Sequence, residues 1–135
     1  MTTSTVLYQI DLRTQAEHTR SGSRITTDAP VDNHGKGQNF SPTDLLATSL
    51  ASCMLTIMGI VANEHNFKLK HPEAEVFKLM DSNPRRVKEI QIRIRFPECD
   101  LDKKSKKILE KAALNCPVAK SIHSDINQVV QFKYE

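Results

Sequence analysis

The stretch LLATSLASCMLTIMGIVA, residues 45–62, decides the fold because the rest of the chain has to cover it. It contains no charged residue, and its aliphatic side chains recur at the three- and four-residue spacing of an α-helix. Ser41 followed by Pro42 is typical of an N-cap and a first helical residue. Asp44 would then lie in the first turn, where a negative charge suits the helix dipole. A helix that is apolar almost all round is buried in a protein core or in a bilayer.

The composition of this stretch disfavours the membrane alternative. Its 18 residues are at the lower limit for a bilayer span, and four of them are Ser or Thr. The stretch lacks aromatic and basic flanks, and the first ten residues lack a signal-peptide pattern. We therefore expect no membrane association and a single domain over residues 1–135, built around this helix.

Alternating apolar and polar residues predict strands on both sides of the helix. The expected elements are strand 6–12, a turn at 20–24, a returning strand 24–27, a loop over 28–40, strand 73–80, strand 90–96, helix 102–114, a helical continuation within 118–126 and strand 130–134. Two hairpin-like pairs with helices between them predict an α+β domain with an antiparallel sheet.

Charge and composition give little support to a nucleic-acid partner. The net charge is +3, Trp is absent, and aromatic residues make up 5% of the chain, so stacking platforms for bases are scarce. A basic module remains a minor alternative, and it would use the predicted second helix and two arginine pairs. Its residues would be Lys103, Lys104, Lys106, Lys107, Lys111, Arg85, Arg86, Arg93 and Arg95.

The three cysteines are the candidates for chemistry. Their odd number and wide spacing, without a signal peptide, predict a reducing cytoplasm and no structural disulfide. Cys53 lies on the apolar helix, where it is either a core residue or a nucleophile activated by a cation from elsewhere in the fold. Cys99 has acidic neighbours, which disfavour a thiolate. The five histidines form no metal-binding spacing, so we expect no metal and no cofactor.

Cys116 precedes Pro117 and would cap a new helical segment. Backbone N–H groups and the positive end of the helix dipole would then lower the pKa of its thiol. The alternative is a helix break with an incidental cysteine. The residues alone thus indicate an α+β domain in which two cysteines can carry a redox function.

Two stretches together resemble the OsmC/Ohr family, named for osmotically inducible protein C and organic hydroperoxide resistance. They are FSPTDLLATSLASCMLT at residues 40–56 and NCPVAKS at residues 115–121. The resemblance implies an OsmC-like fold, in which antiparallel sheets wrap around long central helices of an intertwined homodimer. It also implies a thiol peroxidase that reduces organic hydroperoxides, with Cys53 as the attacking thiolate and Cys116 as the partner in a disulfide. A dithiol such as a lipoylated protein would reduce that disulfide.

The resemblance further implies an arginine that assists the attack. Arg20 is the best match by its position in the hairpin turn, and Arg24 and Arg13 are alternatives. Peroxidase branches of the family have a glutamate ten residues before the cysteine, where this chain has Thr43, and the nearest acid is Asp44. One residue rotates a helical side chain by about 100°, so Asp44 is not an equivalent substitute. The second hypothesis is therefore a non-catalytic dimer that binds an apolar ligand or a partner in the interface pocket.

Overall fold

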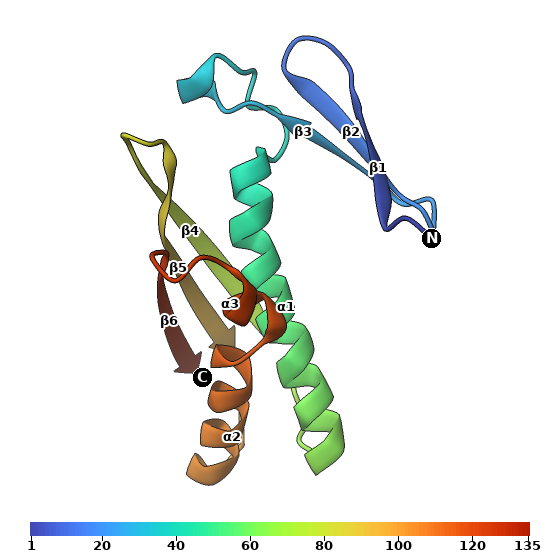
Figure 1. Ribbon diagram of the computed structural model, residues 1–135. Coiled ribbons are helices and arrows are strands. Elements are labelled where there is room, and N and C mark those ends of the chain that lie inside the picture. The colour runs from blue at the N-terminus through green and yellow to red at the C-terminus, as the bar shows by residue number, and fades with distance from the viewer. The chain divides into compact units, whose positions relative to one another are not determined.

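The computed structural model describes all 135 residues and divides into two compact units, Met1–Leu46 and Ala47–Glu135 (Figure 1). Each unit carries one three-stranded sheet. The long helix α1, Pro42–His65, begins in the first unit and continues in the second. The predicted central helix is therefore confirmed, and it extends one turn beyond Ala62.

The N-terminal unit is a sheet of β1 (Ser4–Tyr8), β2 (Arg13–His18) and β3 (Arg24–Asp28), paired antiparallel in that order. The predicted strand over 6–12 is wrong beyond Tyr8. Three consecutive residues, from Ile10 to Leu12, have φ between 53° and 63° and turn the chain into β2. The sequence RTQAEH of β2 has little apolar alternation, which is why the pattern did not predict this strand.

The interior of the N-terminal unit is polar. Its buried residues are Thr27, Asp28 and Ser41, and no residue of this unit belongs to the apolar core. Its exposed large apolar side chains are Met1, Val6, Leu7, Tyr8, Ile10, Leu12, Ile25, Val31, Phe40 and Leu46. The predicted loop over 28–40 is confirmed, and it contains a short 3₁₀ helix, η1, at Val31–Asn33.

Helix α1 begins with a reciprocal cap. The Asp44 N–H donates to Ser41 Oγ at 3.0 Å, and the Ser41 N–H donates to Asp44 Oδ2 at 3.0 Å. The cap confirms Ser41 and Pro42 as the start of the helix. By length and composition alone α1 is long and apolar enough to cross a bilayer, a test that the core helix of a soluble protein also passes.

The C-terminal unit contains a second sheet and two further helices. Its strands are β4 (Glu73–Asp81), β5 (Arg86–Phe96) and β6 (Asn127–Tyr134), in that order. Between β5 and β6 lie α2 (Lys103–Leu114) and α3 (Pro117–Ser121). The predicted strands and the second helix are confirmed, whereas the helical continuation ends at Ser121 rather than near Ile126.

One strand pairing differs from the expected antiparallel sheet. β4 and β5 are antiparallel, but β6 runs parallel to β5, so this sheet is mixed. A parallel pair needs a crossover connection, and α2 and α3 provide it. The fold class, α+β, is confirmed.

The apolar core lies entirely in the C-terminal unit. The inner side chains of β5 alternate with outward-facing polar ones, as the sequence predicted. The fully buried side chains of the core include Leu50, Met54 and Met58 of α1, Ile90, Ile92 and Ile94 of β5, and Leu109 of α2. This packing fixes α1 and the α2–α3 connection in one unit, and each of these two segments carries a cysteine.

Candidate redox site

Cys53 and Cys116 come from different elements of the C-terminal unit. Cys53 lies on α1 and is half-buried, whereas Cys116 lies between α2 and α3 and is fully buried. Cys116 is the N-cap residue of α3, and Pro117 is the first residue of that helix, as predicted. Pro117 has no N–H to continue α2, so the chain breaks at Cys116 and brings this thiol inward.

The two thiols interact across the interior of this unit. Cys53 packs against the buried cluster that contains Cys116, and its proximity raises the pKa of the Cys116 thiol. Both cysteines are free thiols. Two neighbouring thiols, 63 positions apart in the chain, can form a disulfide on oxidation.

The backbone amides act on Cys116 in the predicted direction, but the prediction that the pKa of its thiol is lowered overall is wrong. Burial raises the pKa of this thiol, and the neighbouring Cys53 raises it further. The amide groups of Ala119 and Val118 favour the thiolate, but they do not outweigh the loss of water around the buried sulfur. Local sequence showed the cap, whereas the desolvation comes from the tertiary fold.

Cys99 has a different setting. It is half-buried after the end of β5, and its N–H donates to the Glu135 carbonyl at 2.9 Å. Its neighbour is Tyr134, whose hydroxyl donates to Glu110 at 2.6 Å. Burial and the Glu110 carboxylate raise the pKa of Tyr134. Cys99 therefore lies beside the C-terminal end of the chain, in surroundings that differ from those of Cys53 and Cys116.

The three candidate arginines of the N-terminal unit differ in their partners. Arg20 lies exposed in the turn between β2 and β3 and forms no ion pair. Arg24 lies 3.7 Å from Glu17 in an exposed pair. Arg13 lies on β2 and forms a two-pronged ion pair with Asp28, in which Nε donates at 2.7 Å and Nη2 at 3.1 Å.

The carboxylate of Asp28 is the most strongly perturbed acid of this unit. It also accepts hydrogen bonds from the Gln38 N–H and from the Asn39 side chain, both at 3.1 Å. The Arg13 guanidinium lowers the pKa of Asp28 to about 2, with Asn39 and Gln38 adding to the effect. Sequence reasoning missed Asp28 because its partner lies 15 residues earlier, on a strand that was not predicted.

The two residues at the start of α1 take part in local hydrogen bonds. The Asp44 carboxylate accepts from the Ser41 N–H, and Thr43 Oγ1 lies 3.2 Å from Ser41 Oγ. Asp44 thus serves the helix start, which agrees with the expectation that it does not replace a glutamate at position 43.

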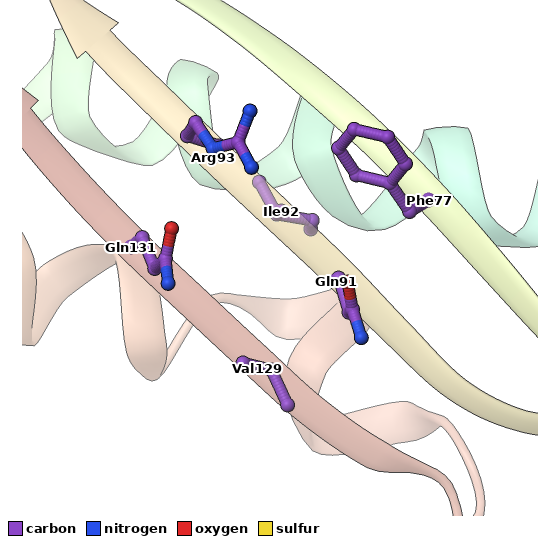
Figure 2. A pocket seen from close by; sticks show the side chains of 6 residues that line it. All are labelled: Phe77, Gln91, Ile92, Arg93, Val129 and Gln131. Carbon is purple, nitrogen blue, oxygen red and sulfur yellow. The ribbon is translucent and has the colours of Figure 1, made fainter.

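Two surface hollows of the C-terminal unit have linings that contain no cysteine. The smaller, of about 60 Å³, lies on the sheet and is lined by Phe77, Gln91, Ile92, Arg93, Val129 and Gln131 (Figure 2). There the Arg93 guanidinium lies 5.5 Å from the centre of the Phe77 ring. The larger, of about 490 Å³, is lined by Gly59, Ala62, Asn63 and residues 67–70.

The fold and the paired thiols define a class: a small α+β protein with one cysteine on a long helix and a second at a helix break. The family description "OsmC-like protein" matches residues 35–130, and the chain belongs to this family. A solved structure from Psychrobacter arcticus 273-4, named for an osmotic stress induced and detoxification response, is 59% identical, with a TM-score of 0.93. The similarity covers 98% of this chain and 96% of that one.

More distant structures share the fold. The OsmC-like protein of Mycoplasma pneumoniae is 18% identical, with a TM-score of 0.81 over 97% of this chain and 94% of that one. The organic hydroperoxide resistance protein OhrB of Bacillus subtilis is 20% identical, with a TM-score of 0.69 over 98% of both chains. A search of curated proteins gave no significant match.

Proposed function

We propose that this protein is a thiol peroxidase that reduces organic hydroperoxides through a disulfide between Cys53 and Cys116. The observation that carries the proposal is that these two free thiols belong to one packed cluster within one unit. Membership of the OsmC-like family and the name of its Bacillus subtilis structural relative support the substrate class.

The proposed reaction has three balanced steps. The Cys53 thiolate attacks the peroxide ROOH, breaks the O–O bond and becomes a sulfenic acid, while RO⁻ leaves and takes up a proton. The Cys116 thiol condenses with the sulfenic acid, which forms the disulfide and releases water. A dithiol then reduces the disulfide, is itself oxidised to a disulfide, and returns both cysteines as thiols.

The assignment of Cys53 as the attacking residue has a physical basis. Attack needs a thiolate, and the raised pKa of Cys116 disfavours that form. Cys53 is also the more accessible of the two, because it is half-buried whereas Cys116 is fully buried. Cys53 packs against the apolar core, and an apolar setting favours an alkyl peroxide over hydrogen peroxide.

We propose further that an arginine of the N-terminal unit stabilises the leaving alkoxide. Arg20 is the first candidate, since its guanidinium has no ion pair within the chain. Arg13 is the second, because Asp28 holds it in a fixed orientation. Replacing the acting arginine with Gln should slow oxidation of Cys53 by about 10²–10³-fold, the usual loss for one charge-stabilising donor.

The exposed apolar surface of the N-terminal unit supports a homodimer. A three-stranded sheet without an apolar core is not stable by itself in water, and Val6, Leu7 and Ile25 are exposed on it. A second copy that covers these side chains would bury them. We expect the dimer to act in the reducing cytoplasm, where a cellular dithiol can complete the cycle.

A non-catalytic dimer that binds an apolar ligand is the second candidate function. Thr43 favours it, because this position offers no carboxylate to orient an arginine, and Asp44 is engaged in the helix cap. Turnover of a peroxide separates the two functions.

Mass spectrometry of the non-reduced protein, before and after one equivalent of cumene hydroperoxide, tests the proposal. We expect rapid formation of a Cys53–Cys116 crosslink, and slower formation with hydrogen peroxide. Cys53→Ser should abolish peroxide consumption, Cys116→Ser should trap a sulfenic acid on Cys53, and the control Cys99→Ser should react as the wild type does. If both thiols stay reduced, the binding protein is the better account; a sulfenic acid on Cys116 would reverse the roles.

A further inference from the structure

The exposed face of α2 consists almost entirely of lysine. The exposed residues of this helix are Lys103, Lys104, Lys107, Lys111 and Leu114, which we call the lysine face. The opposite side of the helix, with Leu109 and Ala113, is buried in the core. The lysine face therefore has a fixed orientation toward solvent.

The lysine face is electrostatically unfavourable for the helix itself. Lys103, Lys107 and Lys111 follow one another at four-residue intervals, so like charges are neighbours on the surface. Two lysines lie at the helix start, where the dipole disfavours positive charge, and the first turn has no acid. None of the four lysines forms an ion pair, and Asp102, the N-cap, is the acid that interacts with Lys104.

The lysine face lies on the helix that ends just before Cys116 in the chain. A helix rises about 1.5 Å per residue, so the four lysines extend for about 12 Å toward the C-terminal end of α2. There Leu114 is 47% exposed, and Cys116 follows two residues later. Beyond the cysteine, Lys120 on α3 is exposed as well. Positive charge thus flanks the position of Cys116 in the chain, with an apolar side chain beside it.

We infer that the lysine face docks an acidic protein that carries a dithiol and reduces the Cys53–Cys116 disulfide. The inference rests on the proposed function and adds the binding surface and the charge of the reductant. Complementary charge would speed the encounter, and Leu114 would supply an apolar contact. An acidic protein fits better than a nucleic acid, because the net charge is only +3 and the exposed face contains no aromatic residue.

The reduction step exchanges one disulfide for another. A thiolate of the partner attacks one sulfur of the Cys53–Cys116 disulfide and forms a mixed disulfide, releasing the other cysteine as a thiolate. The second thiol of the partner resolves the mixed disulfide, so the partner leaves oxidised. The two protons of the dithiol end on Cys53 and Cys116.

The test uses the full chain and a reduced lipoyl domain of negative net charge as the probe. The triple variant Lys103→Glu, Lys107→Glu, Lys111→Glu is compared with a control of equal net charge, Lys68→Glu, Lys88→Glu, Lys133→Glu. Peroxide turnover is measured with the lipoyl domain and, separately, with dithiothreitol, which needs no docking surface. Circular dichroism verifies that both variants fold, and a Lys→Gln triple at the same α2 positions separates loss of charge from its reversal.

We expect the α2 variant to lose about tenfold or more in kcat/KM for the lipoyl domain, since charges at a docking surface act mainly on association. Its turnover with dithiothreitol and the control's turnover with either reductant should not change. Raising the salt concentration should reduce the difference between wild type and variant. An equal loss in both triple variants, or no loss in either, would overturn the inference.

Two further measurements keep the inference separate from the proposed function. The peroxide-induced disulfide is measured first, without any reductant, and its absence would count against the peroxidase alone. Binding of the lipoyl domain, measured by fluorescence anisotropy, then tests the docking surface without turnover: binding that the α2 triple weakens supports it, and unaffected binding overturns it. Selective loss of binding to duplex DNA, with lipoyl-domain binding unchanged, would assign the surface to nucleic acid instead.

Discussion

The two units of this chain are built in opposite ways. The C-terminal unit has an apolar interior of aliphatic side chains from α1, α2 and β5, and mostly polar residues outside. The N-terminal unit has a polar interior around the Arg13–Asp28 ion pair and large apolar side chains on its surface. The first arrangement is stable through its own packing, whereas the second contains a buried ion pair and leaves its large apolar side chains exposed, as binding surfaces do.

The comparison predicts that packing mutations affect the two units differently, and the largest effect belongs to the apolar core. Leu109→Ala empties space at a fully buried position of α2 and should lower the free energy of unfolding by about 2–5 kcal/mol. Leu114→Ala on the same helix is the matched control; this side chain is 47% exposed, and we expect a change within about 0.5 kcal/mol. Urea denaturation measures both. A small effect at Leu109 would mean that the core collapses around the cavity.

The second prediction concerns the apolar surface of the N-terminal unit. Ile25→Asp places a charge where an apolar side chain is 49% exposed on β3, and we expect the dissociation constant of the homodimer to rise at least about tenfold, or 1.4 kcal/mol. Phe77→Asp, at an exposed apolar position of the other sheet, is the control and should leave the dimer intact. Light scattering over a range of concentrations measures the change. Dissociation by Phe77→Asp alone would move the interface to the C-terminal unit.

The third prediction tests the ion pair in the interior of the N-terminal unit. The pKa of Asp28 is about 2 in the folded protein, below its ordinary value of 3.8. The ionised form is thus favoured by folding, so the stabilisation is fully present above pH 4 and is lost as the pH falls toward 2. Hydrogen exchange of the β2 and β3 amides should accelerate over this range.

Asp28→Asn should remove the acid-dependent part of this protection. The neutral amide still accepts hydrogen bonds but loses the attraction to Arg13, so exchange in β2 and β3 should be faster at neutral pH and less dependent on acid. The core of the C-terminal unit serves as the internal reference, since its amides should exchange at the same rate in both proteins. An unchanged acid profile in Asp28→Asn would show that other carboxyl groups govern the loss.

The same contrast explains how much the sequence could predict. In the C-terminal unit the alternation of Ile90, Ile92, Ile94 and Phe96 predicted β5. Every second side chain of a strand points to the same face, so a strand with one buried face has an apolar residue at every second position. In the N-terminal unit, β2 was missed and β1 was extended too far, because neither strand has an apolar face buried within the unit.

The candidate site was predictable to the extent that it depends on local signals. The Cys116 cap was predicted from Pro117, but the raised pKa of Cys116 arises from burial that no local pattern contains. The pairing of Arg13 with Asp28 joins two strands through their register, and one of those strands lacked a sequence signal. The pKa of Cys116 and the Arg13–Asp28 ion pair both depend on contacts between distant parts of the chain, so only the folded structure shows them.

The smallest predicted effect lies where α1 begins, in the N-terminal unit, before the helix enters the C-terminal one. Ser41→Ala removes the oxygen that accepts the Asp44 N–H at 3.0 Å, and this should cost about 1 kcal/mol, the typical value of an N-cap. Ser52→Ala lies within the same helix at an exposed position and should be neutral or slightly stabilising, because Ala has the higher helix propensity. Thermal denaturation of the two variants measures the difference. If Ser41→Ala is also neutral, packing of α1 in the C-terminal unit is enough to hold the start of the helix without its cap.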